Sequence, residues 1–153
     1  EKYIILEVEI DSRSEGEQIS LADVLLEYNN MLTQRRDTLD GRVDIQFTTN
    51  QNEVEENIDK LTTVSAVLQI ATERSEEAVI LRDQGLVQEA QASMMANSFF
   101  LAESAAALES DELAGYGAEM AEGAEAIADD EEWNAKRKEL VDEQHEKRSQ
   151  QSY

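Results

Sequence analysis

The chain has 153 residues and no cysteine, and its 13 lysine and arginine residues are outnumbered by 35 aspartate and glutamate residues, for a formal net charge of −22. This length suits one domain or two small pieces and is enough to bury a core. The lack of cysteine excludes disulfides, thiolate nucleophiles and cysteine-bound metal clusters. The negative charge disfavours nucleic acids and anionic lipids as partners and favours cationic or neutral protein surfaces.

No stretch approaches the roughly 18 consecutive apolar residues of a membrane-spanning helix, so we expect no membrane span. The sequence starts at Glu1 with neither an initiator methionine nor a signal peptide. We therefore expect the chain to be a piece of a longer protein. No targeting motif indicates a compartment.

Residues 1–50 have the patterns of β-strands. Within residues 2–10, Leu6, Val8 and Ile10 alternate with glutamates, as in a half-buried strand. Residues 19–28 predict a second strand, and the alternating residues 41–49 predict a third. Three strands make a partial antiparallel sheet, which we expect to be part of a β-sandwich and to have exposed edges.

Residues 51–153 have helical spacing and predict an acidic, alanine-rich antiparallel bundle of about four helices. Short connections between the helices predict that neighbours run in opposite directions. The first helix is expected to begin at a capping box of Asn52 and Glu55 and to end just before Gly85. The second helix is expected over residues 86–108. Ser110 is expected to be the N-cap of the third helix, and Asp129 with Glu132 is expected to begin the last one. The apolar face expected for the first helix is Val54, Ile58, Leu61, Val64, Leu68, Ala71, Ala78 and Leu81. The predicted fold class is therefore α+β, with parts at 1–50 and 51–153.

Two acidic segments are candidates for metal sites. The sequence from Asp11 to Ser14 follows the first predicted strand, where a metal-ion-dependent adhesion site has the pattern Asp-x-Ser-x-Ser. Arg13 and Glu15 occupy the two required serine positions, so we interpret this segment as a polar turn. The run from Asp129 to Glu132 lacks the EF-hand pattern, and acidic residues are expected at a helix start.

The remaining candidates also favour structural roles. His145 is the only histidine and lies in a polar helix, so we interpret it as a surface residue. The pairs Met94-Met95 and Phe99-Phe100 could form an adaptable binding surface, but core packing with one member of each pair exposed is favoured. Tyr116 and Trp133 are expected to pin the last helices to the bundle. No residue is assigned as catalytic, cofactor-binding or metal-binding, and we expect neither a cofactor nor enzyme activity.

Basic residues are concentrated in the last predicted helix. Residues 51–153 contain 8 basic and 24 acidic residues. Five of the basic ones belong to this helix, and they are Lys136, Arg137, Lys138, Lys147 and Arg148. A helix of mixed charge can either lie along the acidic bundle or reach a partner.

The order of these features resembles the region after the von Willebrand factor type A (VWA) domain in bacterial VWA-domain or calcium-activated-chloride-channel-like proteins. The resemblance rests on the three predicted strands, on Glu53-Val54-Glu55 before a long helix, on the turn at residues 83–90, and on residues 131–138 of the last helix. It implies that the strands close a small β-sandwich. The metal-binding residues of such proteins belong to the VWA domain, so the resemblance assigns no ligand to this chain.

Two functional hypotheses follow. The first is a non-catalytic C-terminal accessory module for protein interaction, whose strands dock on the upstream VWA domain or on a protein partner, or whose strand edges form a homodimer. The second is a free-standing acidic helical adaptor that binds a basic protein or peptide in a groove of the bundle.

Overall fold

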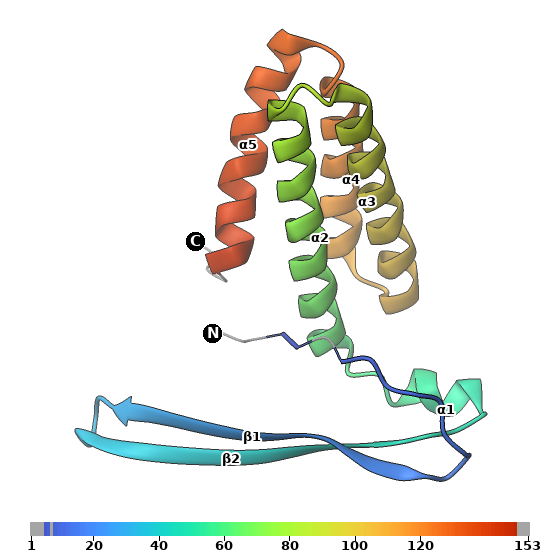
Figure 1. The fold of residues 1–153 in the computed structure, drawn as a ribbon, viewed down its shortest axis with the longest axis vertical. Helices are drawn as coiled ribbons and strands as arrows, with labels where there is room; N and C mark the ends of the chain where they lie inside the picture. Colours follow the sequence, from blue (N-terminus) through green and yellow to red (C-terminus); the bar gives the residue numbers. More distant parts are fainter. Residues whose placement is uncertain (1–4, 7, 150–153) are drawn as a thin grey trace. The chain divides into compact units, whose positions relative to one another are not determined.

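The computed structural model describes residues 5, 6 and 8–149, and its class is α+β, as predicted (Figure 1). The elements within these residues are β1 (Gln18–Asn30), β2 (Arg35–Gln46), α1 (Gln51–Glu56), α2 (Lys60–Asp83), α3 (Val87–Leu108), α4 (Asp111–Ala126) and α5 (Asp130–Ser149). They form two compact units, one of residues 8–58 with both strands and α1, and one of residues 5, 6 and 59–149 with α2 to α5. The predicted boundary at residue 50 falls before α1, whereas this division falls after it.

The strands β1 and β2 form an antiparallel hairpin with a short loop. Asn30 organises the loop, because its side-chain oxygen accepts hydrogen bonds from the backbone of Leu32 and Thr33 at 3.0 and 3.3 Å. Its side-chain nitrogen donates to Asp37 across the hairpin at 2.7 Å. Gln34 closes the loop in a left-handed conformation with φ of 54°. The predicted second strand is confirmed as β1, and the predicted third strand is β2, which begins six residues earlier than expected.

The first predicted strand, residues 2–10, is wrong where it can be compared. Residues 5, 6 and 8–10 have no strand conformation, and residues 1–4 and 7 lie outside the described residues. Leu6, Val8 and Ile10 are exposed. Alternation makes a segment suitable for a strand, but a strand also needs a neighbour to pair with. The described sheet therefore has two strands instead of three.

The first predicted helix is two helices in the structure, which raises the helix number from four to five among the described residues. Asn57 ends α1, and its side chain donates back to the Glu53 carbonyl at 2.8 Å. Asp59 then caps α2 by accepting from the Thr62 backbone at 3.1 Å. The expected capping box at Asn52 is also wrong, because the N-cap of α1 is Asn50. The three residues expected to begin the apolar face, Val54, Ile58 and Leu61, are consequently exposed.

The later boundaries are confirmed. Gly85 follows the C-cap of α2 with a φ of 82°, the left-handed conformation that glycine adopts without strain. Ser110 caps α4 by accepting from the Leu113 backbone at 3.3 Å. Asp129 accepts from the backbone of Glu131 and Glu132 at 2.8 and 3.0 Å at the start of α5.

Helices α2 to α5 run alternately up and down and enclose the core of the larger unit (Figure 1). Its fully buried side chains include Met94, Leu101, Leu113, Met120, Ile127 and Leu140, and Tyr116 and Trp133 are buried as predicted. Three buried polar contacts within the described residues join α2 to its neighbours. Gln144 of α5 donates to Ser75 at 2.8 Å, Asn97 of α3 donates to the Ala71 carbonyl at 2.8 Å, and Tyr116 of α4 donates to Thr72 at 3.5 Å. None of the described helices combines the length and apolar character needed to cross a membrane.

Small residues bring α3 and α4 close together. A Cβ atom at Gly117 would lie 3.2 Å from the Cβ of Leu101 and 3.4 Å from the Ser98 carbonyl oxygen. Both are rigid parts of α3, so the contact has little room to relax. A Cβ at Gly115, two residues earlier on α4, would meet no atom of the described chain within 4 Å.

We predict that Gly117→Val destabilises the bundle by about 1–3 kcal/mol, because the added side chain overpacks the contact with Leu101. Gly115→Val introduces the same side chain into open space and is the matched control. It should change the free energy of unfolding by less than about 0.5 kcal/mol. Urea unfolding followed by circular dichroism measures both variants, and equal effects would contradict the close approach of α3 and α4.

Candidate interaction surfaces

One face of the hairpin is apolar. Cross-strand partners point to the same side of a sheet, and the pairs Ile19–Ile45, Ala22–Val43 and Leu26–Leu39 share this side. An irregularity between Ser20 and Ala22 adds one residue to β1 and keeps the apolar residues of both strands on one side. The apolar face, as named below, consists of Ile19, Ala22, Val24, Leu26, Tyr28, Leu39, Gly41, Val43 and Ile45. Asp37, the partner of Tyr28, ends it near the loop.

The apolar face is open to solvent over much of its length. The exposed fractions of Val24, Leu26 and Leu39 are 50%, 53% and 56%. The hairpin loop adds Met31 and Leu32, which are 88% and 96% exposed. A contiguous exposed apolar surface marks an interaction site, and a lone two-stranded hairpin is only marginally stable in water.

The opposite face of the hairpin is polar and charged. Arg36 pairs with Glu27 across the strands at 2.6 Å. Arg42 pairs with Asp44 at 2.9 Å and lies 4.0 Å from Asp23. The hairpin is therefore amphipathic, with one face suited to water and the other to burial.

The structure assigns local roles to the acidic segments considered as metal sites. Arg13 pairs with Glu17 at 2.8 Å, beside Asp11 in an exposed loop. Hydrogen bonds from the backbone of Glu132 and Glu131 lower the pKa of Asp129, as expected for a carboxylate that caps a helix. No group of three acidic or histidine side chains within the described residues is arranged to hold a metal ion.

The other candidate residues divide between core and surface. His145 is exposed. Met94 is fully buried, whereas Phe99 is 65% exposed. Met95 and Phe100 are partly buried and pack against the core. The expectation of one exposed member is therefore confirmed for the phenylalanine pair and is wrong for the methionine pair, because Met95 is partly covered by the core.

Helix α5 lies along the bundle, one of the two arrangements that its charge allowed. Arg137 binds Asp83 of α2 through two hydrogen bonds of 2.6 and 3.0 Å, and this contact lowers the pKa of Asp83. Arg148 pairs with Glu76 of α2 at 2.8 Å. Lys136 pairs with Glu122 of α4 at 2.9 Å. These basic side chains are occupied within the bundle.

Two carboxyl groups meet between α4 and α5. The hydrogen bond with Glu143 of α5 raises the pKa of Glu119 to about 7, and burial and the charge of Glu143 act in the same direction. Lys147 and Lys136 of α5 oppose this rise. Lys147 pairs with Glu143 at 3.1 Å, and its ammonium lies 4.5 Å from the centre of the Tyr116 ring. The pair therefore holds a proton near neutral pH.

We predict that the bundle loses stability as the pH rises from about 4.5 to about 7. The folded chain keeps the Glu119 proton up to about pH 7, whereas an unfolded glutamate loses it near pH 4.5. Folding takes up a proton in this window, so raising the pH favours the unfolded state. Glu119→Gln keeps the hydrogen bond without the ionisation and should flatten the pH profile of thermal unfolding. The matched control Glu125→Gln, at an exposed position of α4, should leave the pH dependence of thermal unfolding as it is in the unaltered chain. If Glu119→Gln also leaves this pH dependence unchanged, Glu119 and Glu143 do not share a proton.

Sequence reasoning missed the first half of β2 and the Glu119–Glu143 pair. The first was detectable, because the alternation of Ile45, Val43 and Gly41 continues back to Leu39. The second carried no signal in the sequence, since its two residues belong to different helices.

Searches of protein-family models, of curated proteins and of solved structures find no match to this chain.

Proposed function

We propose that this chain is a non-catalytic accessory module for protein interaction in a VWA-domain protein. In this proposal the hairpin completes a β-sandwich by packing its apolar face on a β-sheet that precedes it in the same protein. The resemblance described above supports the VWA assignment, and the uncovered apolar face is the observation that supports docking on a sheet.

The shape and patterning of the hairpin fit this role. Sheets in a sandwich pack face to face at about 10 Å, and their inner faces are apolar while their outer faces are polar. The pairs Leu26–Leu39 and Ala22–Val43 provide such an inner face. The ion pairs of Arg36 and Arg42 lie on the other side, which fits a solvent-exposed outer face.

The net charge favours a different sheet, rather than a second copy of this chain, as the partner that covers the apolar face. Each copy has a net charge of −22, so two copies repel each other as they approach. A sheet from the same protein is covalently tethered and reaches the hairpin at a high effective concentration.

The first experiment reads the coding frame before Glu1 and compares the longer protein with the 153-residue chain by hydrogen exchange. We expect a hydrophobic strand followed by Asp-x-Ser-x-Ser in the frame. We also expect the β1 and β2 amides to exchange at least about tenfold more slowly in the longer protein, because docking protects them. A frame without the motif would reject the VWA assignment, and equal exchange would reject docking.

Neighbouring leucines of β1 provide a matched pair of variants. Leu26 belongs to the apolar face, whereas Leu25, which is 68% exposed, belongs to the polar one. Leu26→Glu should remove the protection in the longer protein, because a buried unpaired charge opposes packing. Leu25→Glu should keep it. If light scattering shows instead that the 153-residue chain dimerises and that Leu26→Glu prevents this, a second copy covers the face and the proposal is wrong.

A further inference from the structure

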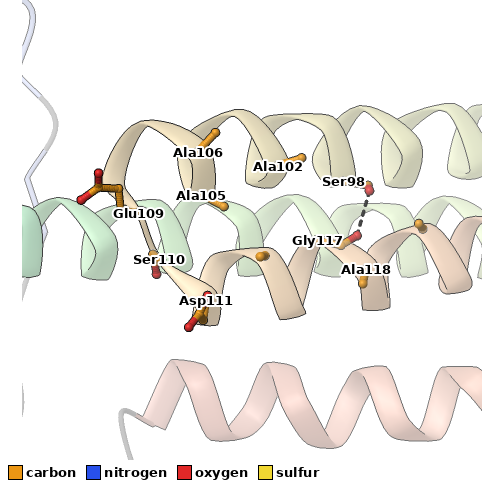
Figure 2. Close-up of a pocket in the computed structure, with 11 residues that line it drawn as sticks. Ser98, Ala102, Ala105, Ala106, Glu109, Ser110, Asp111, Gly117 and Ala118 are labelled. Carbon is orange, nitrogen blue, oxygen red and sulfur yellow. Dashed lines mark hydrogen bonds between the residues drawn. The ribbon is translucent and has the colours of Figure 1, made fainter.

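The helical unit has an apolar groove between α3 and α4 that the proposed role of the hairpin does not use. The groove has a volume of about 650 Å³ and is open along one side. Figure 2 shows its walls, with Ala102 and Ala106 on α3 and Ala118 on α4. At its floor, Ser98 donates to the Gly117 carbonyl at 2.8 Å, so these polar atoms already have partners. The walls therefore present methyl groups and little that needs a hydrogen bond.

Phe99 extends the apolar surface beyond the groove. It lies three residues before Ala102 and seven before Ala106, which places it on the same side of α3. Its side chain is 65% exposed and adds a large apolar group beside the alanines. A ligand lying along the groove would cover this ring as well as the alanines.

Acidic residues predominate around the groove. Between Arg82 and Lys136 the sequence contains 13 acidic residues and no lysine or arginine. Asp111 lines the groove, and Glu125 follows Ala118 by seven residues on the same side of α4. Neither carboxylate takes part in an ion pair within the described residues, although Glu109 at the end of the groove pairs with Lys60 at 2.8 Å.

The other half of the bundle differs. Along α2 and α5, acidic groups face basic ones, as in the pairs Asp83–Arg137 and Glu76–Arg148. The negative charge of Asp111 and Glu125 beside the groove is therefore not balanced by an ion pair within the described residues. It raises the local concentration of cationic ligands and selects against anionic ones.

We propose that the groove between α3 and α4 binds a basic amphipathic helix of a partner protein. The apolar stripe of that helix lies on the alanines and on Phe99, and its lysine or arginine residues extend over the rim to Asp111 and Glu125. Small wall residues allow helix axes to approach to about 8 Å, so the stripe consists of small or medium apolar residues at helical spacing. This inference is independent of the role proposed for the hairpin.

The test uses the 153-residue chain and a fluorescent peptide of about 18 residues, or five helical turns, with alanine and leucine on one face and lysine on the other. Fluorescence anisotropy measures its affinity. We expect saturable binding that weakens as salt is added, because the rim contacts are electrostatic. A scrambled peptide of the same composition should bind at least about tenfold more weakly, since it lacks the apolar stripe.

Adjacent alanines of α3 provide the matched variants. Ala106 lines the groove, whereas Ala107 is exposed but does not line it. Ala106→Phe should weaken binding at least about tenfold by filling the groove, while Ala107→Phe should leave the affinity unchanged. Both sites are exposed, so both variants should fold, and circular dichroism checks this. Asp111→Asn should weaken binding by about threefold and reduce its salt dependence.

Three results would overturn the inference. One is the absence of binding by the amphipathic peptide. Another is that the scrambled peptide binds as tightly as the amphipathic one. The third is that Ala106→Phe binds the amphipathic peptide as tightly as the unaltered chain does. Either of these last two results would mean that the peptide is attracted only by the net charge of −22. Leu26→Glu in the hairpin should leave peptide binding unchanged, so a failure of the proposed docking of the hairpin would not be mistaken for a failure here.

Discussion

The hairpin cannot cover its own apolar face, because the side chains that two paired strands place on one side all point away from the sheet. A second layer over this face is therefore not supplied by the hairpin itself. The four long helices solve the same problem among themselves, since each turns an apolar stripe toward the others and side chains such as Leu101, Leu113 and Met120 are fully buried. The two units therefore differ in their cores. The helices of the bundle bury their apolar side chains against one another, whereas the apolar side chains of the hairpin have no second layer packed on them in the described chain. The proposed docking on a neighbouring sheet follows from this difference.

Much of the fold could be predicted where single residues decide the local backbone. Gly85 and Ser110 mark helix ends through a left-handed turn and a side-chain cap, which depend on few neighbours. Prediction failed where the outcome depends on pairing. The alternation of Leu6, Val8 and Ile10 is suitable for a strand, yet these residues have no strand neighbour in the described chain. The alternation of β2 could be followed back to Leu39, but the residues before it were hidden by charged side chains such as Arg36, whose ion pair with Glu27 exists only after the strands have met.

The candidate surfaces were less accessible to sequence reasoning than the fold. Alternation shows that a strand has an apolar side, but exposure of that side depends on what lies above it. The net charge of −22 favoured cationic or neutral protein surfaces as partners. It could not locate the groove, because the groove exists only where α3 and α4 meet, and most of the basic residues that pair with acidic ones in the other half of the bundle come from α5. Glu119 and Glu143 likewise become a pair only through the crossing of two helices.

The buried hydrogen bond between Gln144 and Ser75 has a consequence for the alignment of α5. This helix buries only Trp133, Leu140 and Gln144, so apolar packing alone would discriminate weakly between its present position and one shifted along α2 by a turn. A shift of one turn would carry Gln144 away from Ser75 and leave two buried polar groups unpaired. It would also separate Arg137 from Asp83. These polar contacts therefore favour one alignment of α5 along α2. In exchange, the core contains polar groups instead of being fully apolar.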